Sequence, residues 1–479
     1  MNNKIKFISN LFWRYAERSG AQIVTFLVSV VLARILEPSV YGTVALITVF
    51  TNILQVFVDS GLGNALIQKK GADNTDFSTV FFFNIAFCLA LYALLFIAAP
   101  LLATFYKNAA LTPYIRVLGL TIVISGVKNV QQAYVSRNML FKRFFFATLA
   151  GTIGAAVIGI WMAYHGFGVW SLIAQQLFNL AVDTLVLWLT VKWRPILRFS
   201  WGRFKQLFGF GWKMLVSSLL DTIYIDLSQL VIGKFYTESA LAFYNRGGQF
   251  PRLIVGNINS SINSVLLPTM AADQDHKDRV RQMVRRSITI STYIMAPLMV
   301  GLAVLAPQVV HLLLTDKWLP CVFYLRIFCF VYAFYPIHTA NLNAITAMGR
   351  SDLFLKLEIE KKVLGFTLLL ITAPISVKAM AYSSLVSTMG SILINAAPNR
   401  KLLDYSYRQQ LRDILPYLVL AIAMGAVVWS VGLLPLPFAL LLLIQVLIGA
   451  VFYIGVSCLL KLDCYQYLMG IMRTAVKKK

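Results

Sequence analysis

Fourteen long apolar stretches, separated by short charged, proline- or glycine-containing segments, follow one another along the 479-residue chain. A membrane-spanning helix needs about 20 mostly apolar residues. The predicted spans lie at about 12–36, 41–67, 79–105, 113–135, 144–164, 168–191, 208–233, 243–271, 287–314, 322–347, 353–377, 379–398, 414–433 and 436–460. The sequence therefore predicts an all-α polytopic membrane protein with 14 transmembrane helices.

The composition excludes the water-soluble classes of protein. Hydrophobic residues make up 59% of the chain and charged residues 13%, against about 45–50% and 25% in soluble domains. A soluble enzyme, a disordered chain and a secreted disulfide scaffold are therefore excluded. The five cysteines form no C-x-x-C pair and are interpreted as packing residues. We expect no metal site and no cofactor.

Basic residues predict the orientation in the membrane. With the N-terminus inside, 34 of the 43 Lys and Arg fall on the inner side, as the positive-inside rule requires. Both termini are therefore expected to be cytoplasmic, and the net charge of +24 does not indicate a nucleic-acid partner. The basic clusters at Arg279–Arg286 and Lys477–Lys479 are expected to anchor helix ends to anionic membrane lipids.

An internal repeat divides the chain. Residues 31–42 and 231–242 share an apolar span end, a basic residue, a short serine-containing turn and a small residue that opens the next span. Six predicted spans separate the two copies, which therefore have the same orientation, as in transporters with parallel repeats. We expect two pseudo-symmetric six-helix lobes, 1–205 and 206–405, followed by two C-terminal helices and a basic tail at 406–479.

Polar side chains recur every three or four residues on the first two predicted spans of each lobe, and so share one helix face. They include Arg14, Arg18 and Gln22 in span 1, Asn52, Gln55 and Asp59 in span 2, Asp221 in span 7, with Asp226 near the same face, and Arg246, Gln249 and Asn257 in span 8. A charged side chain at mid-bilayer costs about 2.5–3.5 kcal/mol, so these faces are expected to meet in a water-filled cavity between the lobes. Small polar residues that only join helices, an interfacial position for Arg246, and snorkelling of Arg14 and Arg18 to the inner interface remain alternatives.

Span 8 contains helix-disrupting residues beside its arginine. Gly247 and Gly248 follow Arg246 directly, and Pro251 follows three residues later. Because proline cannot donate the helical hydrogen bond, we expect span 8 to be discontinuous or kinked here. These three residues are the predicted hinge.

Two segments of the first lobe resemble a known family. Arg34-Ile35-Leu36-Glu37-Pro38-Ser39-Val40-Tyr41-Gly42 and the span ending at 59–67 are similar to the polysaccharide transporter family (Wzx-like O-antigen, colanic acid and teichuronic acid flippases) of the multidrug/oligosaccharidyl-lipid/polysaccharide (MOP) exporter superfamily. The resemblance covers the whole chain. It implies a multi-pass protein of the bacterial cytoplasmic inner membrane that translocates undecaprenyl-pyrophosphate-linked oligosaccharides, as precursors of exopolysaccharide or lipopolysaccharide, by alternating access.

A narrower resemblance concerns span 8. Arg246-Gly247-Gly248-Gln249-Phe250-Pro251 is similar to span 8 of the lipid II flippases, and this likeness implies that Arg246 contacts the pyrophosphate. Guanidinium groups suit phosphate because their planar fork binds it bidentately, so Arg18 and Arg14 are further candidates.

The remaining polar residues have predicted roles in the same transport cycle. Gln22, Asn52, Gln55, Gln249 and Asn257 are expected to line the glycan path. Asp59, Asp221 and Asp226 could couple transport to H⁺ or Na⁺, or could balance the arginines. The expected partners are the lipid-linked oligosaccharide and membrane lipids, with a polysaccharide polymerase and glycosyltransferases as further candidates, and the protein is expected to be a monomer.

Two other functions remain open at this stage. A cation-coupled drug or metabolite antiporter of the same superfamily would favour acidic and aromatic cavity residues. A membrane glycosyltransferase or polymerase acting on the same lipid carrier would require a large external loop with paired carboxylates. No predicted external loop exceeds about ten residues, so we expect no catalytic residues and interpret the chain as a transporter rather than an enzyme.

Overall fold

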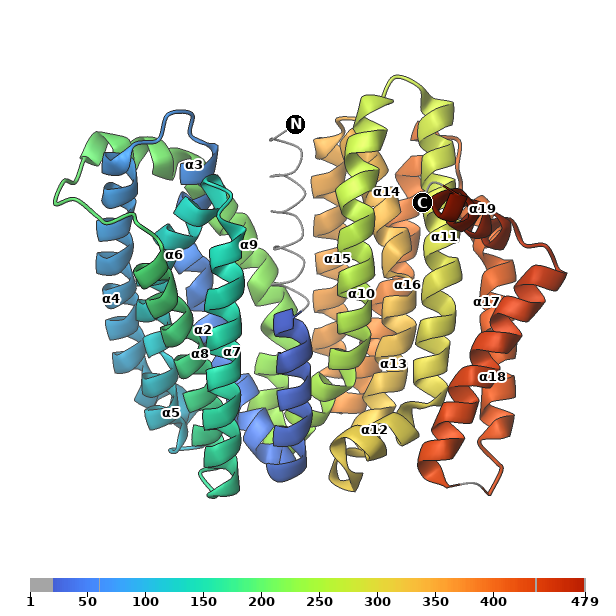
Figure 1. Ribbon diagram of the computed structural model, residues 1–479, viewed down its shortest axis with the longest axis horizontal. Coiled ribbons are helices and arrows are strands. Elements are labelled where there is room, and N and C mark those ends of the chain that lie inside the picture. Colours follow the sequence, from blue (N-terminus) through green and yellow to red (C-terminus); the bar gives the residue numbers. More distant parts are fainter. Residues whose placement is uncertain (1–19, 60, 436, 478–479) are drawn as a thin grey trace. The chain divides into compact units, whose positions relative to one another are not determined.

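The computed structural model of the protein describes residues 20–59, 61–435 and 437–477 (Figure 1). Within these ranges the regular structure is helical, and the chain divides into two compact units, unit 1 (Met1–Ala242) and unit 2 (Phe243–Lys479). The predicted all-α fold is confirmed for the described residues.

Unit 1 is a bundle of long helices. After a helix at Gly20–Ile35 come α2 (Pro38–Asp59), α3 (Leu62–Gln68), α4 (Asn74–Phe105), α5 (Leu111–Leu118), α6 (Leu120–Arg137), α7 (Phe141–Tyr164), α8 (Val169–Thr190) and α9 (Trp201–Phe235). Helix α10 (Glu238–Ala272) begins in unit 1 and continues into unit 2. Aromatic side chains dominate one core cluster of unit 1, where Phe81 packs against Trp188 and Trp193. Such rings bury large apolar areas, which stabilises the bundle.

The two copies of the sequence repeat fold alike. In the first, a helix ends at Ile35 and the next begins at Pro38; in the second, a helix ends at Phe235 and the next begins at Glu238. Helix α2 also contacts the start of α10 inside unit 1, because a Cβ atom on Gly42 would lie 1.8 Å from the backbone oxygen of Glu238. Only glycine allows so close an approach of the two backbones.

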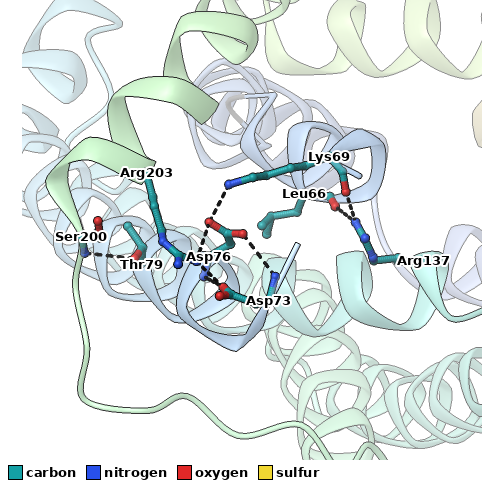
Figure 2. A network of polar contacts seen from close by, with 8 residues as sticks. All are labelled: Leu66, Lys69, Asp73, Asp76, Thr79, Arg137, Ser200 and Arg203. Carbon is teal, nitrogen blue, oxygen red and sulfur yellow. Dashed lines mark hydrogen bonds and ion pairs between the residues drawn. The ribbon is translucent and has the colours of Figure 1, made fainter. Parts of the chain in front are cut away.

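A network of charges fixes the turn between α3 and α4 (Figure 2). Asp73 caps α4 by accepting a hydrogen bond from the backbone N–H of Asp76 at 3.0 Å, and the Asp76 carboxylate accepts one from the backbone of Asp73 at 3.2 Å. Lys69 lies 2.8 Å from the Asp76 carboxylate, and Arg203 from α9 forms ion pairs with Asp73 and Asp76. This capping box satisfies N–H groups that the helix itself cannot, and the ion pairs join α9 to the turn.

Backbone groups beside this turn are also hydrogen-bonded (Figure 2). Arg137, in the last turn of α6, donates to the backbone oxygens of Leu66 at 2.5 Å and Lys69 at 2.7 Å. The backbone N–H of Ser200 donates to the buried Thr79 hydroxyl at 3.1 Å. Arg137 therefore satisfies carbonyls at the end of α3, and Thr79 holds the residue that precedes α9.

Unit 2 repeats the bundle and adds a crosswise helix. Its further elements are α11 (Lys277–Val304), α12 (Ala306–Leu314), the 3₁₀ helix η1 (Asp316–Trp318), α13 (Cys321–Ala333), α14 (Tyr335–Ala347), α15 (Ser351–Thr372), α16 (Val377–Leu402), α17 (Tyr407–Val431), α18 (Phe438–Leu459) and α19 (Asp463–Lys477). Helices α11, α17 and α18 enclose a core in which Tyr453 donates a hydrogen bond to the Tyr293 backbone oxygen at 2.8 Å. The short helix α19 crosses α11, where Tyr467 stacks on Arg286 (Figure 1).

Eleven helices of the described part are long and apolar enough to cross a membrane. The three other predicted spans coincide with the Gly20–Ile35 helix, α10 and α15, which are too short or too polar for that criterion. The protein is therefore a multi-pass helical membrane protein. The count of fourteen spans, the cytoplasmic termini and the lobe boundaries at 205 and 405 remain predictions.

Candidate functional site

Unit 1 contains a polar cavity of about 470 Å³ among α2, α6, α7 and α8. Six amide, five hydroxyl, three charged and one apolar side chain line it: Asn52, Gln55, Asn129, Gln132, Gln176, Asn179, Thr48, Thr51, Thr121, Ser125, Thr148, Asp59, Lys128, Asp183 and Leu180. A second cavity of about 540 Å³ shares Asp59, Lys128 and Asp183 with the first. We call these two hollows the unit 1 cavity; its lining offers many hydrogen-bonding groups and little net charge.

A buried ion pair crosses this cavity. Lys128 from α6 pairs with the Oδ2 atom of Asp183 from α8, and their side chains are 14% and 11% exposed. The second carboxylate oxygen of Asp183, Oδ1, is buried and accepts no hydrogen bond from the described residues. A buried acceptor without a donor is costly, so Oδ1 is suited to a hydroxyl group or a cation from a ligand.

Asp59 lies at the end of α2, where several polar groups meet. Its carboxylate accepts hydrogen bonds from Gln55 at 3.4 Å and Asn129 at 3.3 Å, and Asn129 also donates to the Val58 backbone oxygen at 3.0 Å. After Asp59 the chain turns through Gly61, whose φ of 68° is left-handed. Glycine adopts this conformation without steric cost, which ends α2 and leaves Asp59 at the cavity.

Two of the predicted polar faces meet in unit 1. Asn52 of α2 donates a hydrogen bond to Oδ2 of Asp226 on α9 at 3.3 Å, and Gln229 donates to Oδ1 at 2.7 Å. Asp226 is only 6% exposed. These donors stabilise a buried carboxylate and join the polar face of predicted span 2 to that of predicted span 7.

Arg246 lies in a compact cluster of unit 2. It is 6% exposed, donates a hydrogen bond to Gln249, and its guanidinium carbon lies 5.0 Å from the ring centroid of the buried Trp318. Stacking on an aromatic face is a favourable position for guanidinium. The structure therefore unites two of the predicted site residues, Arg246 and Gln249, on one helix.

The expected break in α10 is absent, because the helix is continuous from Glu238 to Ala272. Gly247 instead allows close packing: a Cβ atom there would lie 2.5 Å from Cβ of Tyr324 on α13. A Cβ atom on Gly248 would lie 3.5 Å from the ring of Phe328, an ordinary van der Waals distance. Pro251 lies inside the helix. The structure therefore excludes a discontinuous helix, while the alternative of a kink and the hinge role of these residues stay predictions.

The remaining predicted residues are dispersed. Arg14 and Arg18 lie outside the described residues, Gln22 is partly buried, and Asp221 and Asn257 are exposed. Asn257 borders a separate, mostly apolar hollow of about 420 Å³ in unit 2.

The prediction of site residues omitted Lys128 and Asp183. A signal was present in both spans: Gln176, Asn179 and Asp183 recur at helical spacing in α8, and Lys128 is followed by Asn129 in α6. A charged side chain in an apolar span needs a polar or charged partner, so both residues were candidates from sequence, although their pairing was not.

The sequence is similar to known proteins. The model of the family described as "Polysaccharide biosynthesis protein" matches residues 31–323. The chain is 26% identical over 309 residues to the succinoglycan biosynthesis transport protein ExoT of Rhizobium meliloti, covering 64% of this chain and 63% of that protein. It is 22% identical over 408 residues to the lipopolysaccharide biosynthesis protein WzxC of Escherichia coli, covering 83% of each.

Solved structures show the same fold. The lipid II flippase MurJ in an inward closed conformation has a TM-score of 0.75 at 15% identity, covering 96% of this chain and 100% of that one. An inward-facing multidrug resistance MATE transporter of the MOP superfamily has a TM-score of 0.65 at 16% identity, covering 80% and 94%. At these identities the likeness concerns the fold.

Proposed function

Because the chain belongs to the polysaccharide biosynthesis protein family, we propose that it is a flippase that carries pyrophosphate-linked oligosaccharides on a polyprenyl lipid across the bacterial cytoplasmic membrane by alternating access. The named relatives ExoT and WzxC are proteins of succinoglycan and lipopolysaccharide biosynthesis. The chain matches 63% of the length of ExoT, so the activity and the substrate are part of this proposal.

The observation that carries the proposal is the lining of the unit 1 cavity. Eleven side chains of its first hollow are amides or hydroxyls, and sugars present hydroxyl groups that both donate and accept hydrogen bonds. The unpaired Oδ1 atom of Asp183 can accept a hydrogen bond from a glycan hydroxyl, which removes the cost of its burial. A neutral, hydroxyl-rich ligand thus fits a cavity whose own charges are largely paired.

The pyrophosphate requires cations in addition. We assign it to Arg246, with Arg18 and Arg14 as further contacts, because bidentate guanidinium groups bind phosphate strongly. Gln249, which accepts a hydrogen bond from Arg246, orients the guanidinium group. The carboxylates of Asp59 and Asp226 already accept hydrogen bonds from amide side chains, which favours a role in balancing the charge of the arginines. Coupling of transport to H⁺ or Na⁺ through these residues or Asp221 remains the alternative.

Export in cells tests both parts of the proposal. A bacterium that depends on this gene for polysaccharide export would receive the wild type, Arg246→Ala, Arg246→Lys or the double variant Gln176→Leu/Asn179→Leu, with membrane abundance checked by immunoblot. We expect loss of export for Arg246→Ala and for the double variant, and incomplete rescue by Arg246→Lys, because ammonium lacks the planar fork.

The control is Gln68→Leu, an exposed amide at the end of α3 outside the unit 1 cavity. It should export normally. Normal export by both Arg246→Ala and the double variant would refute the site. Normal export in the deleted strain, together with new sensitivity to toxic cations, would instead support the drug antiporter.

A further inference from the structure

Unit 2 contains a second cavity, of about 900 Å³, whose chemistry differs from that of unit 1. It is lined by the first four turns of α11, by the second and third turns of α17, and by the turn between α18 and α19 with the start of α19. Its charged and hydroxyl-bearing lining comprises Arg279, Arg285, Arg286, Arg412, Lys461, Asp413, Asp463, Thr289, Tyr417 and Tyr467. We call it the basic cavity.

The cations of the basic cavity outnumber its carboxylates by five to two. Arg285 pairs with Asp413 at 2.7 Å, and Asp413 also accepts a hydrogen bond from the Tyr405 hydroxyl at 2.8 Å. Arg279 pairs at 3.2 Å with Asp273, which lies outside the cavity. These contacts position part of the cluster. With Asp273 counted, the five cations still exceed the neighbouring carboxylates by two.

Two arginines of the basic cavity, Arg286 and Arg412, have guanidinium N–H groups that can donate further hydrogen bonds. Arg412 is exposed and has no recorded partner among the described side chains. The guanidinium carbon of Arg286 lies 4.0 Å from the ring centroid of Tyr467 on α19, a stacked position that leaves the N–H edge of the group available. Lys461 adopts a left-handed φ of 50° in the turn before α19, which is uncommon for a residue other than glycine.

The position of the basic cavity relates it to the membrane surface. Helices α11 and α17 are long and apolar enough to span a bilayer, and the cavity lies where both begin. The crosswise helix α19 lies beside α11 (Figure 1) and contributes Asp463, Cys464 and Tyr467 to the lining. Segments this basic remain on the cytoplasmic side, where the leaflet contains anionic lipids.

We propose that the basic cavity binds the phosphate group of a lipid headgroup in the cytoplasmic leaflet. The surplus cations supply the charge, and Arg286 and Arg412 supply guanidinium N–H donors for phosphate oxygens. Phosphatidylglycerol and a polyprenyl pyrophosphate share this chemistry. The proposal does not depend on the transport function, because lipid binding is measured without transport.

Lipid retention by the purified full-length protein tests the proposal. Native mass spectrometry would compare binding of phosphatidylglycerol with that of phosphatidylcholine, and inorganic pyrophosphate would be added as a competitor. The variant is Arg286→Gln/Arg412→Gln. The matched control is Lys401→Gln/Arg408→Gln, which removes two exposed cations from the same end of unit 2 but outside the basic cavity.

We expect affinity for phosphatidylglycerol to fall about 25-fold in the cavity variant, since each cation near an anionic lipid contributes about fivefold. The control should change by no more than about twofold. Competition by pyrophosphate at the same arginines, with weak phosphatidylglycerol binding, would support the proposal and identify a pyrophosphate-bearing lipid as the ligand. Equal losses in both double variants, or no preference for either phosphate over phosphatidylcholine, would overturn it.

Discussion

The unit 1 cavity and the basic cavity of unit 2 handle charge in opposite ways. In unit 1, Lys128 and Asp183 are buried and paired among neutral amides and hydroxyls. In unit 2, five cations face two carboxylates, and Arg286 and Arg412 are exposed. A charge inside a membrane protein must be paired, whereas a surplus is tolerated at the aqueous interface. The first cavity therefore suits a neutral, hydroxyl-rich ligand, and the second suits phosphate.

The largest expected effect comes from breaking the charge balance of unit 1. Lys128→Met would leave Asp183 buried without its partner and should lower the free energy of unfolding by about 3–5 kcal/mol. Thermal unfolding in detergent measures this loss. Lys128→Met/Asp183→Leu should recover most of it, because the double variant buries no charge. Equal destabilisation of the single and double variants would show that the ion pair is not what matters.

The stability of the helix packing around Arg246 should depend on close contacts between side chains instead of on charge balance. Gly247→Ala would force a methyl group against Tyr324 and should cost about 1–3 kcal/mol. Gly248→Ala, one residue later, meets only ordinary contacts and should be neutral or stabilising by up to about 1 kcal/mol, because alanine favours helix. Unfolding of the two variants side by side gives the difference. Similar stabilities would contradict the close approach of α10 and α13.

Removal of a carboxylate from the basic cavity should strengthen lipid binding, whereas removal of its arginines should weaken it. Asp413→Asn removes a negative charge but keeps an acceptor for the Tyr405 hydroxyl, so phosphatidylglycerol affinity should rise about fivefold. Native mass spectrometry provides the measurement. Asp275→Asn, an exposed residue outside the cavity, is the control and should have little effect. Weaker lipid binding by Asp413→Asn would mean that Asp413 contributes through structure and not through charge.

The smallest effect is expected at the exposed ion pair of unit 1. Asp73→Ala removes the cap of α4 and should cost about 1 kcal/mol. The hydrogen bond from Arg203 lowers the pKa of Asp73 to about 2, below its unfolded value of about 3.9. The stabilisation is therefore complete above about pH 4 and is lost as the pH falls through about 2.

Unfolding of wild type and Asp73→Ala at a series of pH values checks this prediction. The difference between them should be constant from about pH 8 to 5 and should shrink below about pH 4. A difference that changes near neutral pH would contradict the assignment to this carboxylate.

The helices were predictable because apolar runs and turn residues act locally. The repeat at 31–42 and 231–242 predicted two turns of the same kind, and the structure has them at matching positions. Span 8 is not interrupted, although its glycines predicted either a discontinuity or a kink, because glycine has two uses. Gly247 provides space for Tyr324, a residue distant in sequence, and no local pattern reveals that contact.

The candidate site was predictable only in part, because contacts between residues distant in sequence leave no local pattern. Helical spacing identified Asn52, Gln55 and Asp59, which do line the unit 1 cavity. Asp183 was missed because its partner Lys128 lies on a different helix, so that the pair exists only after the bundle has formed. Periodicity finds the polar face of one helix, but it does not say which other helix supplies the matching charge.

The most direct test of the proposed flippase activity is translocation of a lipid-linked oligosaccharide by the purified protein in proteoliposomes. A fluorescent pyrophosphate-linked oligosaccharide on a polyprenyl carrier would be loaded into one leaflet, and its arrival in the other would be followed by quenching. We expect translocation by the wild type and by Gln68→Leu, and its loss in Gln176→Leu/Asn179→Leu at equal reconstitution. No translocation by the wild type, or undiminished translocation by the double variant, would contradict the proposed role of the unit 1 cavity.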